Sequence, residues 1–571
     1  MDNRRLLLAA VLSMVILIGW QYMFPPPEVS VPKPVPSAVE APVAGGGEVP
    51  GVTSEPAAVA PAGSPAVGPA EASVPAVEAA AEERRVLEND QVRAEFSNRG
   101  GELVSFRLKG FSDLGKPVEL VRSRAEGSLP LALVDGEGRA LAVSGGLHAV
   151  TERVDADGRP GLSFEYRGPL GVSRKTVTLT SRGSLLVDVE ADAPAGWGLL
   201  LGPGVRELSP EQLASPYSLR YGIYSGGGSV ETITAAKASE VTVVPAVGLA
   251  WAGLEDTYFL AAFIPSKELD RVVFLPRLQV GADAGVRFEP VPTANLAKEQ
   301  KALPRELAMV AVARGGKLAG EAFLGGKDYD VLSSYGVGLE RSVRFGWFGW
   351  FAKMFLRSLQ WIYGNIVANY GWAIVLLTIL IRVVLLPFTH QSMVSAQKMQ
   401  ALNPKVQAIR QKYNGKLRDK KGAVNFENQR KMSEEINAVY KTAGVNPLGG
   451  CLPMLIQLPV LIAFYNLLAN AIELRGAPWL AWITDLSIHD PYYVLPIVMG
   501  AAQFAQQALA PPIGDPMQRK IFMILPVVFT IMFASAPSGL VLYWLVNNLL
   551  SLVQQTFYQR WNARRAEASA A

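Results

Sequence analysis

The sequence predicts a polytopic α-helical membrane protein with a large extracytoplasmic all-β sandwich. Half of its 571 residues are apolar and only 18% are charged, which is low for a soluble chain of this length. Charges are frequent between residues 82 and 344 and become rare in several stretches after residue 358. The charged part alternates apolar and polar residues in short runs, a pattern typical of strands. Two or more folding units are therefore expected.

Residues 1–24 are predicted to form a transmembrane signal anchor. After Arg4 and Arg5 the chain runs for 19 uncharged residues, 6–24, enough to cross a hydrocarbon core of about 30 Å as a helix. A cleaved secretory signal is the alternative, but its apolar region is normally about 7–15 residues long. Residues 25–81, rich in Pro, Ala, Val, Gly and Glu, are predicted to be a disordered linker because they cannot bury enough apolar surface.

Residues 82–332 are predicted to form an antiparallel β sandwich. Gly, Asp, Asn and Pro separate the alternating segments, and no helical pattern intervenes. The clearest segments of period two are 93–97, 103–108, 163–166, 175–179 and 184–190. Arg99-Gly100-Gly101 is one of the turn signals between them.

Residues 340–363 are predicted to form an amphipathic helix in the membrane interface. Aromatic and apolar residues are interleaved there with Arg344, Lys353 and Arg357. A helix packed on the β domain is the alternative. Apolar stretches then predict five more spans, which with the anchor make six transmembrane helices: 364–388, 449–471, 491–510, 521–536 and 540–559. The last two are divided at Pro537-Ser538-Gly539.

The charges of the loops predict the orientation. Segment 389–448 holds eleven Lys and Arg residues against four Asp and Glu, and the tail 560–571 adds three arginines. The loop 472–490 carries three acids and one arginine. Both termini and segment 389–448 are therefore expected in the cytoplasm, with the β domain outside. Apolar residues at three- and four-residue steps predict that segment 389–448 is a helical hairpin, and contact with anionic lipid is a competing explanation for its charge.

Arg382 is the residue most informative about function. An arginine at bilayer depth costs about 2.5–3.5 kcal/mol on insertion scales, so it faces water or a partner, or its long side chain snorkels to the headgroups. Thr378 lies one helical turn earlier on the same face. Amides within the other predicted spans are Gln457, Asn466, Gln503, Gln506, Gln507, Asn547, Asn548 and Gln554. Any one amide can simply join two helices, but together with an unpaired arginine they predict a wetted cavity.

Several functional classes find no support in the sequence. The net charge of +4 is too small to indicate nucleic acid binding. His148, His390 and His489 are widely scattered and lack metal-ligand spacing, so neither a metal nor a cofactor is expected. No Gly-rich phosphate loop is present, and no Asp or Glu lies within a predicted span, which argues against nucleotide-driven and proton-coupled transport. The single cysteine, Cys451, excludes an intrachain disulfide.

Four motifs resemble the YidC-type membrane protein insertases in their Gram-negative form. They are N-P-L-G-G-C-L-P-M-L-I-Q-L-P from Asn446, D-P-Y-Y-V-L-P from Asp490, D-P-M-Q from Asp515 and P-S-G-L-V-L-Y-W from Pro537. Arg382 matches the single groove arginine of the family, and the resemblance covers about 339–559. Segment 99–103 resembles, more loosely, the start of the family's periplasmic domain.

The resemblance implies an ATP-independent insertase and chaperone of the cell inner membrane. It would act alone or beside the Sec translocon on nascent membrane proteins, with its tail on the ribosome and its hairpin required for insertion. The periplasmic domain would be a noncatalytic β-supersandwich, so no enzyme is expected. The candidate groove residues are Arg382, Thr378, Gln457, Asn466, Gln503, Gln506 and Asn547. The hairpin tip, 414–428, is longer than in most members of the family.

Two other functional classes stay open from the residues alone. One is a channel or solute transporter whose polar pore is lined by the same amides. The other is an envelope enzyme or glycan-binding protein that its spans merely anchor. Ion or solute flux at high turnover would favour the first, and sugar turnover by the β domain would favour the second.

Overall fold

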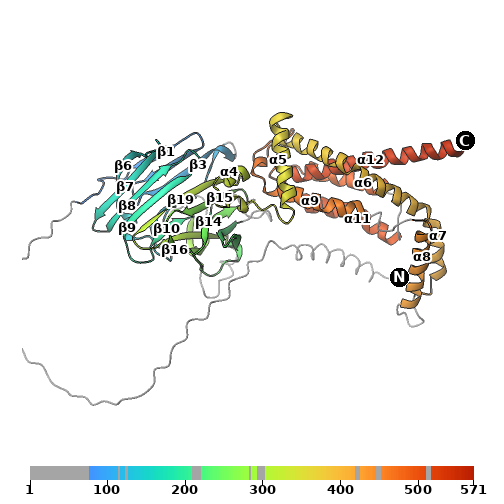
Figure 1. Ribbon diagram of the computed structural model, residues 1–571, viewed down its shortest axis with the longest axis horizontal. Helices are drawn as coiled ribbons and strands as arrows, with labels where there is room; N and C mark the ends of the chain where they lie inside the picture. The colour runs from blue at the N-terminus through green and yellow to red at the C-terminus, as the bar shows by residue number, and fades with distance from the viewer. Residues whose placement is uncertain are drawn as a thin grey trace, which may run out of the picture.

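A computed structural model describes most of the chain after residue 75. The described ranges are 76–113, 116–122, 127–208, 220–281, 285–291, 303–417, 425–444, 452–509 and 516–570. The predicted signal anchor and nearly all of the predicted linker lie outside the described residues, as do residues 418–424 of the hairpin tip and the start of the motif at Asn446. Figure 1 shows a β domain at one end and a bundle of helices that runs away from it.

The β domain is built from three sheets whose recorded pairings are all antiparallel. A four-stranded sheet has the order β1 (Arg84–Glu88), β2 (Val92–Ser97), β3 (Glu102–Asp113), β4 (Lys116–Glu119). A six-stranded sheet has the order β13 (Thr242–Pro245), β16 (Leu269–Val280), β18 (Arg305–Ala313), β10 (Gly198–Leu201), β5 (Leu133–Val134), with β17 (Arg287–Pro290) beside β16. The all-β prediction for this part of the chain is confirmed.

A nine-stranded sheet is the largest of the three. Its order is β12 (Ser229–Thr234), β11 (Arg220–Gly226), β14 (Leu249–Asp256), β15 (Phe259–Pro265), β19 (Lys317–Gly326), β9 (Leu185–Asp192), β8 (Gly171–Leu179), β7 (Pro160–Gly168), β6 (Ala149–Val154). Strand β15 shows how the alternation works: Phe259 and Phe263 point into the core shared with the other two sheets, whereas Leu260 points to the opposite face. Short 3-10 turns, η1 (Ala142–Gly145) and η2 (Ala235–Lys237), lie between strands.

One apolar cluster joins the β domain to the helices. Leu260 and Trp251 of the nine-stranded sheet belong to the same buried cluster as residues of α4 (Tyr329–Ser333), η4 (Leu339–Ser342) and the helical bundle. The two parts therefore pack directly on each other.

Helix α5 (Gly349–Asn365) lies across the bundle at the end next to the β domain (Figure 1). The predicted helix began at residue 340, but in the structure residues 343–348 form a turn in which Gly346 has a φ of 68°. A left-handed residue breaks the helical path, which explains the later start. Phe355 packs against Phe464 of the bundle, whereas Trp350 and Trp361 are exposed. One face of α5 is therefore packed on the bundle and the other is free.

The bundle consists of α6 (Tyr370–Ala401), α9 (Leu452–Asn470), α10 (Val494–Leu509), α11 (Pro516–Phe533) and α12 (Ser538–Ala570), with η6 (Ile472–Leu474) after α9. Helix α6 continues through Pro387, well past the predicted end of its span at residue 388. Proline removes one backbone hydrogen bond without ending a helix whose neighbours hold it. Here the hydroxyls of Thr389 and Ser395 donate to carbonyls of the preceding turn, as helical residues of this type do.

Within the described residues, α6 is the one helix that is long and apolar enough to cross a membrane by length and composition. Shorter apolar helices are Leu458–Asn470, Val494–Leu509 and Met523–Phe533. The total of six transmembrane helices therefore stays a prediction.

Helices α7 (Asn403–Tyr413) and α8 (Phe426–Thr442) pack together at the end of the bundle opposite the β domain (Figure 1). Val406 and Tyr413, two of the apolar residues spaced at helical steps in segment 389–448, are buried. Glu435 of α8 accepts hydrogen bonds from Tyr413 Oη at 2.8 Å and from Lys412 Nζ at 2.6 Å. We call this end of the bundle the hairpin end and the other the β-domain end.

Candidate functional site

Arg382 projects from α6 onto α12. Its Nε donates to Asn547 Oδ1 at 2.8 Å, and its Nη2 donates to the Asn547 carbonyl at 3.1 Å and to Ser551 Oγ at 2.5 Å. These acceptors are neutral oxygens, and no carboxylate pairs with Arg382 anywhere in the described residues. The side chain is only partly buried, and among the described residues Nη1 has no hydrogen-bond partner. Arg382 is therefore anchored by a neighbouring helix, while its positive charge stays uncompensated.

A second polar contact lies seven residues, or about two helical turns, further along both helices. Gln554 Nε2 donates to Thr389 Oγ1 at 2.8 Å, and this pair has the same sequence separation, 165 residues, as the Arg382 contact. The rings of His390 and Tyr558 then stack with centroids 5.0 Å apart. Helices α6 and α12 are therefore parallel neighbours. We call the following residues the polar seam: Arg382, Thr389, Asn547, Ser551 and Gln554.

Thr378 lies one turn before Arg382 and is 1% exposed. Its Oγ1 donates to the Ile374 carbonyl at 2.6 Å, so its proton is used within α6. The hydroxyl oxygen still has acceptor capacity. Thr378 thus adds a small polar atom to the interior of the bundle beside Arg382, as its position in the sequence predicts.

Unpaired amide atoms lie on α10 and α12. Gln503 Oε1 and Asn548 Nδ2 are buried, and neither finds a hydrogen-bond partner in the described part of the chain. Gln506, one turn beyond Gln503, is half-buried. A buried polar group without a partner costs about 1–3 kcal/mol, so such atoms are normally met by water or by a ligand. The two unpaired amides favour water inside this part of the bundle.

Asn466 lies elsewhere. It is near the β-domain end of α9, where its Nδ2 donates to the Phe345 carbonyl at 3.3 Å, and Asn470 Nδ2 reaches the Arg344 carbonyl at 3.5 Å. These two amides hold the turn that precedes α5, and the structure does not bring Asn466 to Arg382. Gln457 lies within α9, but its side chain is outside the described residues.

Ser551, Thr389 and their contacts were not among the predicted site residues. Ser551 follows Asn547 by four residues, so both lie on the same face of α12. A signal for Ser551 was therefore present in the spacing. Thr389 lies directly after the predicted end of its span, outside the segments in which polar residues are site candidates, so no signal for it is present in the sequence.

The helices around the polar seam are packed unevenly. Helix α12 packs against α6 and α10, and more lightly against α9, whereas α9 packs mainly on α5. Helix α11 packs mainly on α10, and within the described residues no substantial contact joins α9 to α11. In the described residues, α9 and α11 therefore do not close against each other.

A buried ion-pair group connects the β domain to the bundle. Glu255 of β14, 1% exposed at its side chain, pairs with Arg344 and with Lys327, the latter at 3.3 Å. Arg344 also lies over the ring of Tyr221 at 4.0 Å. The carbonyl of Arg344 accepts a hydrogen bond from Asn470 of α9, so the turn before α5 is bound both to the β domain and to the helical bundle.

Glu473 of η6 lies where α5 meets the bundle. Gln360 Nε2 of α5 donates to Glu473 Oε1 at 3.1 Å. Burial, with a contribution from nearby Asp328, raises the pKa of Glu473 to about 7. The carboxyl of Glu473 therefore titrates close to neutral pH.

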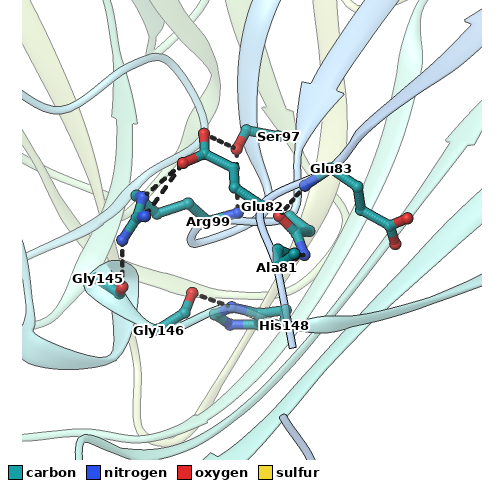
Figure 2. Close-up of polar contacts among 9 residues, drawn as sticks. Ala81, Glu82, Glu83, Ser97, Arg99, Gly145, Gly146 and His148 are labelled. Atoms are coloured by element: carbon teal, nitrogen blue, oxygen red, sulfur yellow. Dashed lines mark hydrogen bonds and ion pairs between the residues drawn. The ribbon is translucent and has the colours of Figure 1, made fainter. Parts of the chain in front are cut away.

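The predicted turn at Arg99-Gly100-Gly101 fastens the start of the β domain (Figure 2). Asn98 accepts from the Glu83 amide at 2.9 Å and donates to the Ala81 carbonyl at 2.9 Å. Arg99 pairs with Glu82 at 3.1 Å and donates to the Gly145 carbonyl at 3.1 Å. Every side chain in this group thus has a structural partner.

Lys175 and His148 are buried beneath the same turn. Lys175, 1% exposed, donates to the carbonyls of Gly100, Gly101 and Leu131 at 2.7, 3.0 and 2.5 Å. His148 contacts the Gly146 carbonyl at 3.0 Å (Figure 2) and Ser173 Oγ at 2.9 Å. Burial, and then the charge of Lys175, lower the pKa of His148 to about 4. His148 is therefore a neutral residue of the interior. No group of three metal-binding side chains occurs among the described residues.

Comparison with known proteins gives matches along nearly the whole chain. A family model described as "60Kd inner membrane protein" matches residues 361–565, and one described as "YidC periplasmic domain" matches residues 84–357. A protein of Geobacter metallireducens named "Membrane protein insertase YidC" is 34% identical over 588 aligned residues, covering 98% of each chain. One of the same name from Syntrophus aciditrophicus is 34% identical over 581 residues, covering 98% of this chain and 99% of the relative. A solved structure of an active YidC insertase covers 84% of this chain and 93% of its own, with 18% identity and a TM-score of 0.33.

Proposed function

The chain belongs to the YidC family of membrane protein insertases and is an inner-membrane protein that inserts other membrane proteins; we propose that it does so through a hydrophilic groove lined by Arg382. The observation that carries this proposal is the uncompensated charge of Arg382, whose acceptors on α12 are all neutral. A charge of this kind inside a bundle needs water around it. Water held there would also receive polar segments of a client.

The groove would lower the barrier for polar polypeptide to enter the bilayer. Polar and charged side chains lose their hydration when they move into hydrocarbon, and a wetted cavity inside the membrane reduces that loss. The cation would attract acidic segments in particular, because charges interact more strongly where the dielectric constant is low. No chemical bond is made or broken, so no enzyme activity is proposed.

The proposed lining includes residues from several helices. They are Arg382, Thr378, Gln457, Gln503, Gln506 and Asn547. The unpaired amide atom of Gln503 supports the presence of water. The lack of substantial contact between α9 and α11 in the described residues supports an opening toward lipid on that side, through which an apolar client helix would leave.

We propose six transmembrane helices with both termini in the cytoplasm and the β domain in the periplasm. The position of α7 and α8 at the end opposite the β domain supports this topology (Figure 1), as does the excess of cations in segment 389–448. The exposed Trp350 and Trp361 of α5 support its location in the interface. Helix α10, with 16 residues, would be about 24 Å long and would fit a locally thinned bilayer.

The proposed partners are nascent membrane proteins, the lipid bilayer, the Sec translocon and the ribosome. The hairpin exposes Lys405 and Lys441, and α12 exposes Arg560 and Arg564 beyond the bundle. These cations support contact with the anionic surface of the ribosome. A chaperone role would follow from holding a client helix beside the groove.

Site-specific crosslinking to a stalled nascent membrane protein tests the proposal. A photo-crosslinking amino acid in place of Gln503 is expected to yield an adduct with the client. The matched control replaces Ile497, which lies on the exposed face of the same helix. A client that crosslinks from position 497 and never from position 503 would contradict a path through the groove.

A further inference from the structure

The chain enters the β domain through a short exposed segment. We call residues 77–83, which directly precede β1, the strap. None of them is buried, so hydrogen bonds hold the strap in place more than apolar contacts do. The backbones of Val77 and Arg167 pair in both directions, at 3.0 and 2.9 Å, and the Ala79 amide donates to the Leu147 carbonyl at 2.9 Å. A segment held in this way is among the first to detach locally from a fold.

The other end of the strap is bound by the turn that follows β2 (Figure 2). Asn98 Oδ1 accepts from the Glu83 amide at 2.9 Å, and the Asn98 amide donates to the Glu83 carbonyl at 3.0 Å. Glu82 accepts hydrogen bonds from Arg99 and from Ser97. The bond from Arg99, and then that from Ser97, lower the pKa of Glu82. The ion pair of Glu82 and Arg99 therefore persists in mildly acidic solution.

His148 lies under this attachment. Its amide donates to the Asn98 carbonyl at 2.8 Å. Its buried ring places Nδ1 3.0 Å from the Gly146 carbonyl and Nε2 2.9 Å from Ser173 Oγ. Because a carbonyl can only accept, Nδ1 carries the ring hydrogen and Nε2 accepts from the Ser173 hydroxyl. A second proton, on Nε2, would force that hydroxyl to turn away.

The charges around the imidazole oppose this second proton. Burial lowers the pKa of Lys175 on β8 to about 8, so its ammonium is still charged below neutral pH. Glu102 of β3 attracts Lys175, and among the described residues no carboxylate bonds to the His148 ring. The turn η1 brings no charge. Protonated His148 would thus place a second buried cation near the first.

Strand β7 and a cavity complete the surroundings of the imidazole. Tyr166 of β7 stacks on it with centroids 5.3 Å apart, whereas its charged neighbours, Glu165 and Arg167, lie on the opposite face of the sheet. Tyr166 and Ser173 also line a cavity of about 440 Å³, together with Val77 of the strap. The imidazole therefore lies behind a wall of this cavity. Departure of Val77 would give water a path to it.

We infer that the strap is released by acid: when His148 takes up a proton, residues 77–83 detach from the β domain. The released strap would uncover the amide and carbonyl of Arg167 at the edge of β7. It would also lengthen the free chain ahead of β1 by up to about 25 Å. The switch itself does not depend on the proposed function. Only its role in the cell does, because in the proposed periplasmic location the β domain would meet changes of external pH.

The size of the effect follows from the pKa of His148 in the two forms. Burial, and then the charge of Lys175, lower this pKa to about 4 with the strap in place, whereas a hydrated imidazole has a pKa of about 6.5. The attached form binds the proton less readily, so it becomes less stable as the pH falls from 6.5 toward 4. Relative to pH 7.5, the detached fraction should rise about tenfold at pH 5.5 and about thirtyfold at pH 5.

Hydrogen–deuterium exchange in the full chain in detergent tests the inference. The amides of Val77, Ala79 and Glu83 report on the strap, and those of β8 and β9 report on opening of the whole domain. After correction for the intrinsic pH dependence of exchange, protection of the strap amides should fall about thirtyfold between pH 7.5 and 5. At both pH values they should exchange faster than the amides of β8 and β9. Low concentrations of urea should leave their exchange unchanged, because local detachment exposes little surface.

Histidine variants identify the group that takes up the proton. His148→Gln cannot be protonated but keeps a donor and an acceptor, so its strap should be equally protected at both pH values. The chain has three histidines, and the controls His390→Gln and His489→Gln, outside the β domain, should keep the thirtyfold loss. If His148→Gln does not fold, the pH profile of the parent decides. Uptake of one proton by His148 gives a slope of up to about tenfold per pH unit between pH 6 and 4.5, whereas carboxylates such as Glu82 would act only below about pH 4.5.

Three results would overturn the inference: equal protection of the parent strap at pH 7.5 and 5, a loss that persists in His148→Gln, or a loss that begins only below pH 4.5. Strap amides that exchange in step with those of β8 and β9 would also overturn it, since acid would then act by unfolding the whole domain. None of these readouts uses insertion. Failure of the groove mechanism would therefore leave them unchanged.

Discussion

Replacing Arg382 by lysine separates the positive charge from the hydrogen bonds that anchor it. Lysine keeps the charge, but a single ammonium cannot reproduce the fork of contacts to Asn547 and Ser551. Hydrogen bonds from a charged donor contribute about 1.5–3 kcal/mol each, so the loss of one or two costs the bundle about 3 kcal/mol. Arg382→Lys is therefore expected to melt at lower temperature and still to insert proteins at close to the parent rate.

Arg382→Ala removes the charge as well. An acidic client residue about 7 Å from the guanidinium, at an effective dielectric constant of about 20, is attracted by about 2 kcal/mol. This energy corresponds to a factor of about thirty in rate for a client with an acidic extracytoplasmic tail. A client with a neutral tail should lose much less.

Two further variants complete the comparison. Asn547→Ala combined with Ser551→Ala removes the anchoring side chains and leaves the charge. Lys398→Ala removes an exposed charge from the same helix as Arg382 and should have no effect. The assay is protease protection of a small single-span reporter inserted into vesicles, and thermal melting in detergent is measured beside it.

The insertion rates should follow the charge and not the melting temperature. Arg382→Lys and the Asn547/Ser551 double variant should both be less stable than the parent, yet close to it in insertion. Only Arg382→Ala should lose the acidic-tail reporter. Insertion that falls in proportion to stability across all variants, or an equal loss for neutral and acidic tails, would refute the role given to the cation.

Three further predictions concern other parts of the chain. The β domain should lose about 3 kcal/mol of stability as the pH falls from 6.5 to 4, because His148 stays neutral in the fold down to about pH 4 but takes up a proton near 6.5 when unfolded. Denaturant titration of the parent and of His148→Gln at pH 7 and 4.5 checks this, and equal pH sensitivity of the two would contradict it. Glu473→Gln should stabilise the chain by about 2–3 kcal/mol at pH 8 and hardly at pH 4. The raised pKa of Glu473 means that its carboxyl ionises less easily in the fold than in the unfolded chain, so the parent loses folding stability as the pH rises through 7. Melting curves at both pH values measure the difference, and a gain of equal size at each would be evidence against it. Gly500→Ala should lower the free energy of unfolding by about 1–3 kcal/mol, because the new Cβ would overlap Thr530 Oγ1 on α11. Adding Thr530→Ala should restore most of that stability. No recovery in the double variant would show that the close approach of α10 and α11 is not the cause.

The strands of the β domain could be predicted because their signal is local. In β8, Lys175 and Val177 point into the core while Thr176 and Thr178 alternate with them, and this period of two is visible in the sequence. The sheet order could not be predicted, since neighbours such as β10 and β18 are about a hundred residues apart. Short segments do not encode which distant strand they pair with.

The ends of the helices were harder to predict than their existence. The span predicted from the apolar residues ended at residue 388, but the surrounding turns keep α6 helical to Ala401. The helix predicted from residue 340 begins only at Gly349, because Gly346 is left-handed and the preceding carbonyls are bound by Asn466 and Asn470. Both differences depend on contacts with other helices, which a local pattern does not contain.

The residues of the polar seam were partly predictable and their pairing was not. Arg382 and Asn547 attracted attention as polar residues in apolar stretches, yet the sequence does not say that they touch across 165 residues. Ser551 was missed although it follows Asn547 by one turn. Asn466 was predicted as a groove residue because it is an amide within a span. The residue type does not show which neighbour it contacts, and in the structure Asn466 binds the Phe345 carbonyl at the β-domain end.

Water beside the Arg382 guanidinium can be detected with one pair of cysteines on α12. In the Cys451→Ser background, Ser551→Cys places a thiol against the guanidinium, and Val553→Cys places one on the outer face, where the side chain is 64% exposed and would meet lipid. A charged, water-soluble thiol reagent added from the hairpin end should label position 551 quickly and position 553 hardly at all. Two unreactive thiols, or faster labelling at 553, would mean that no water reaches Arg382 and that polar client segments enter the membrane by another route.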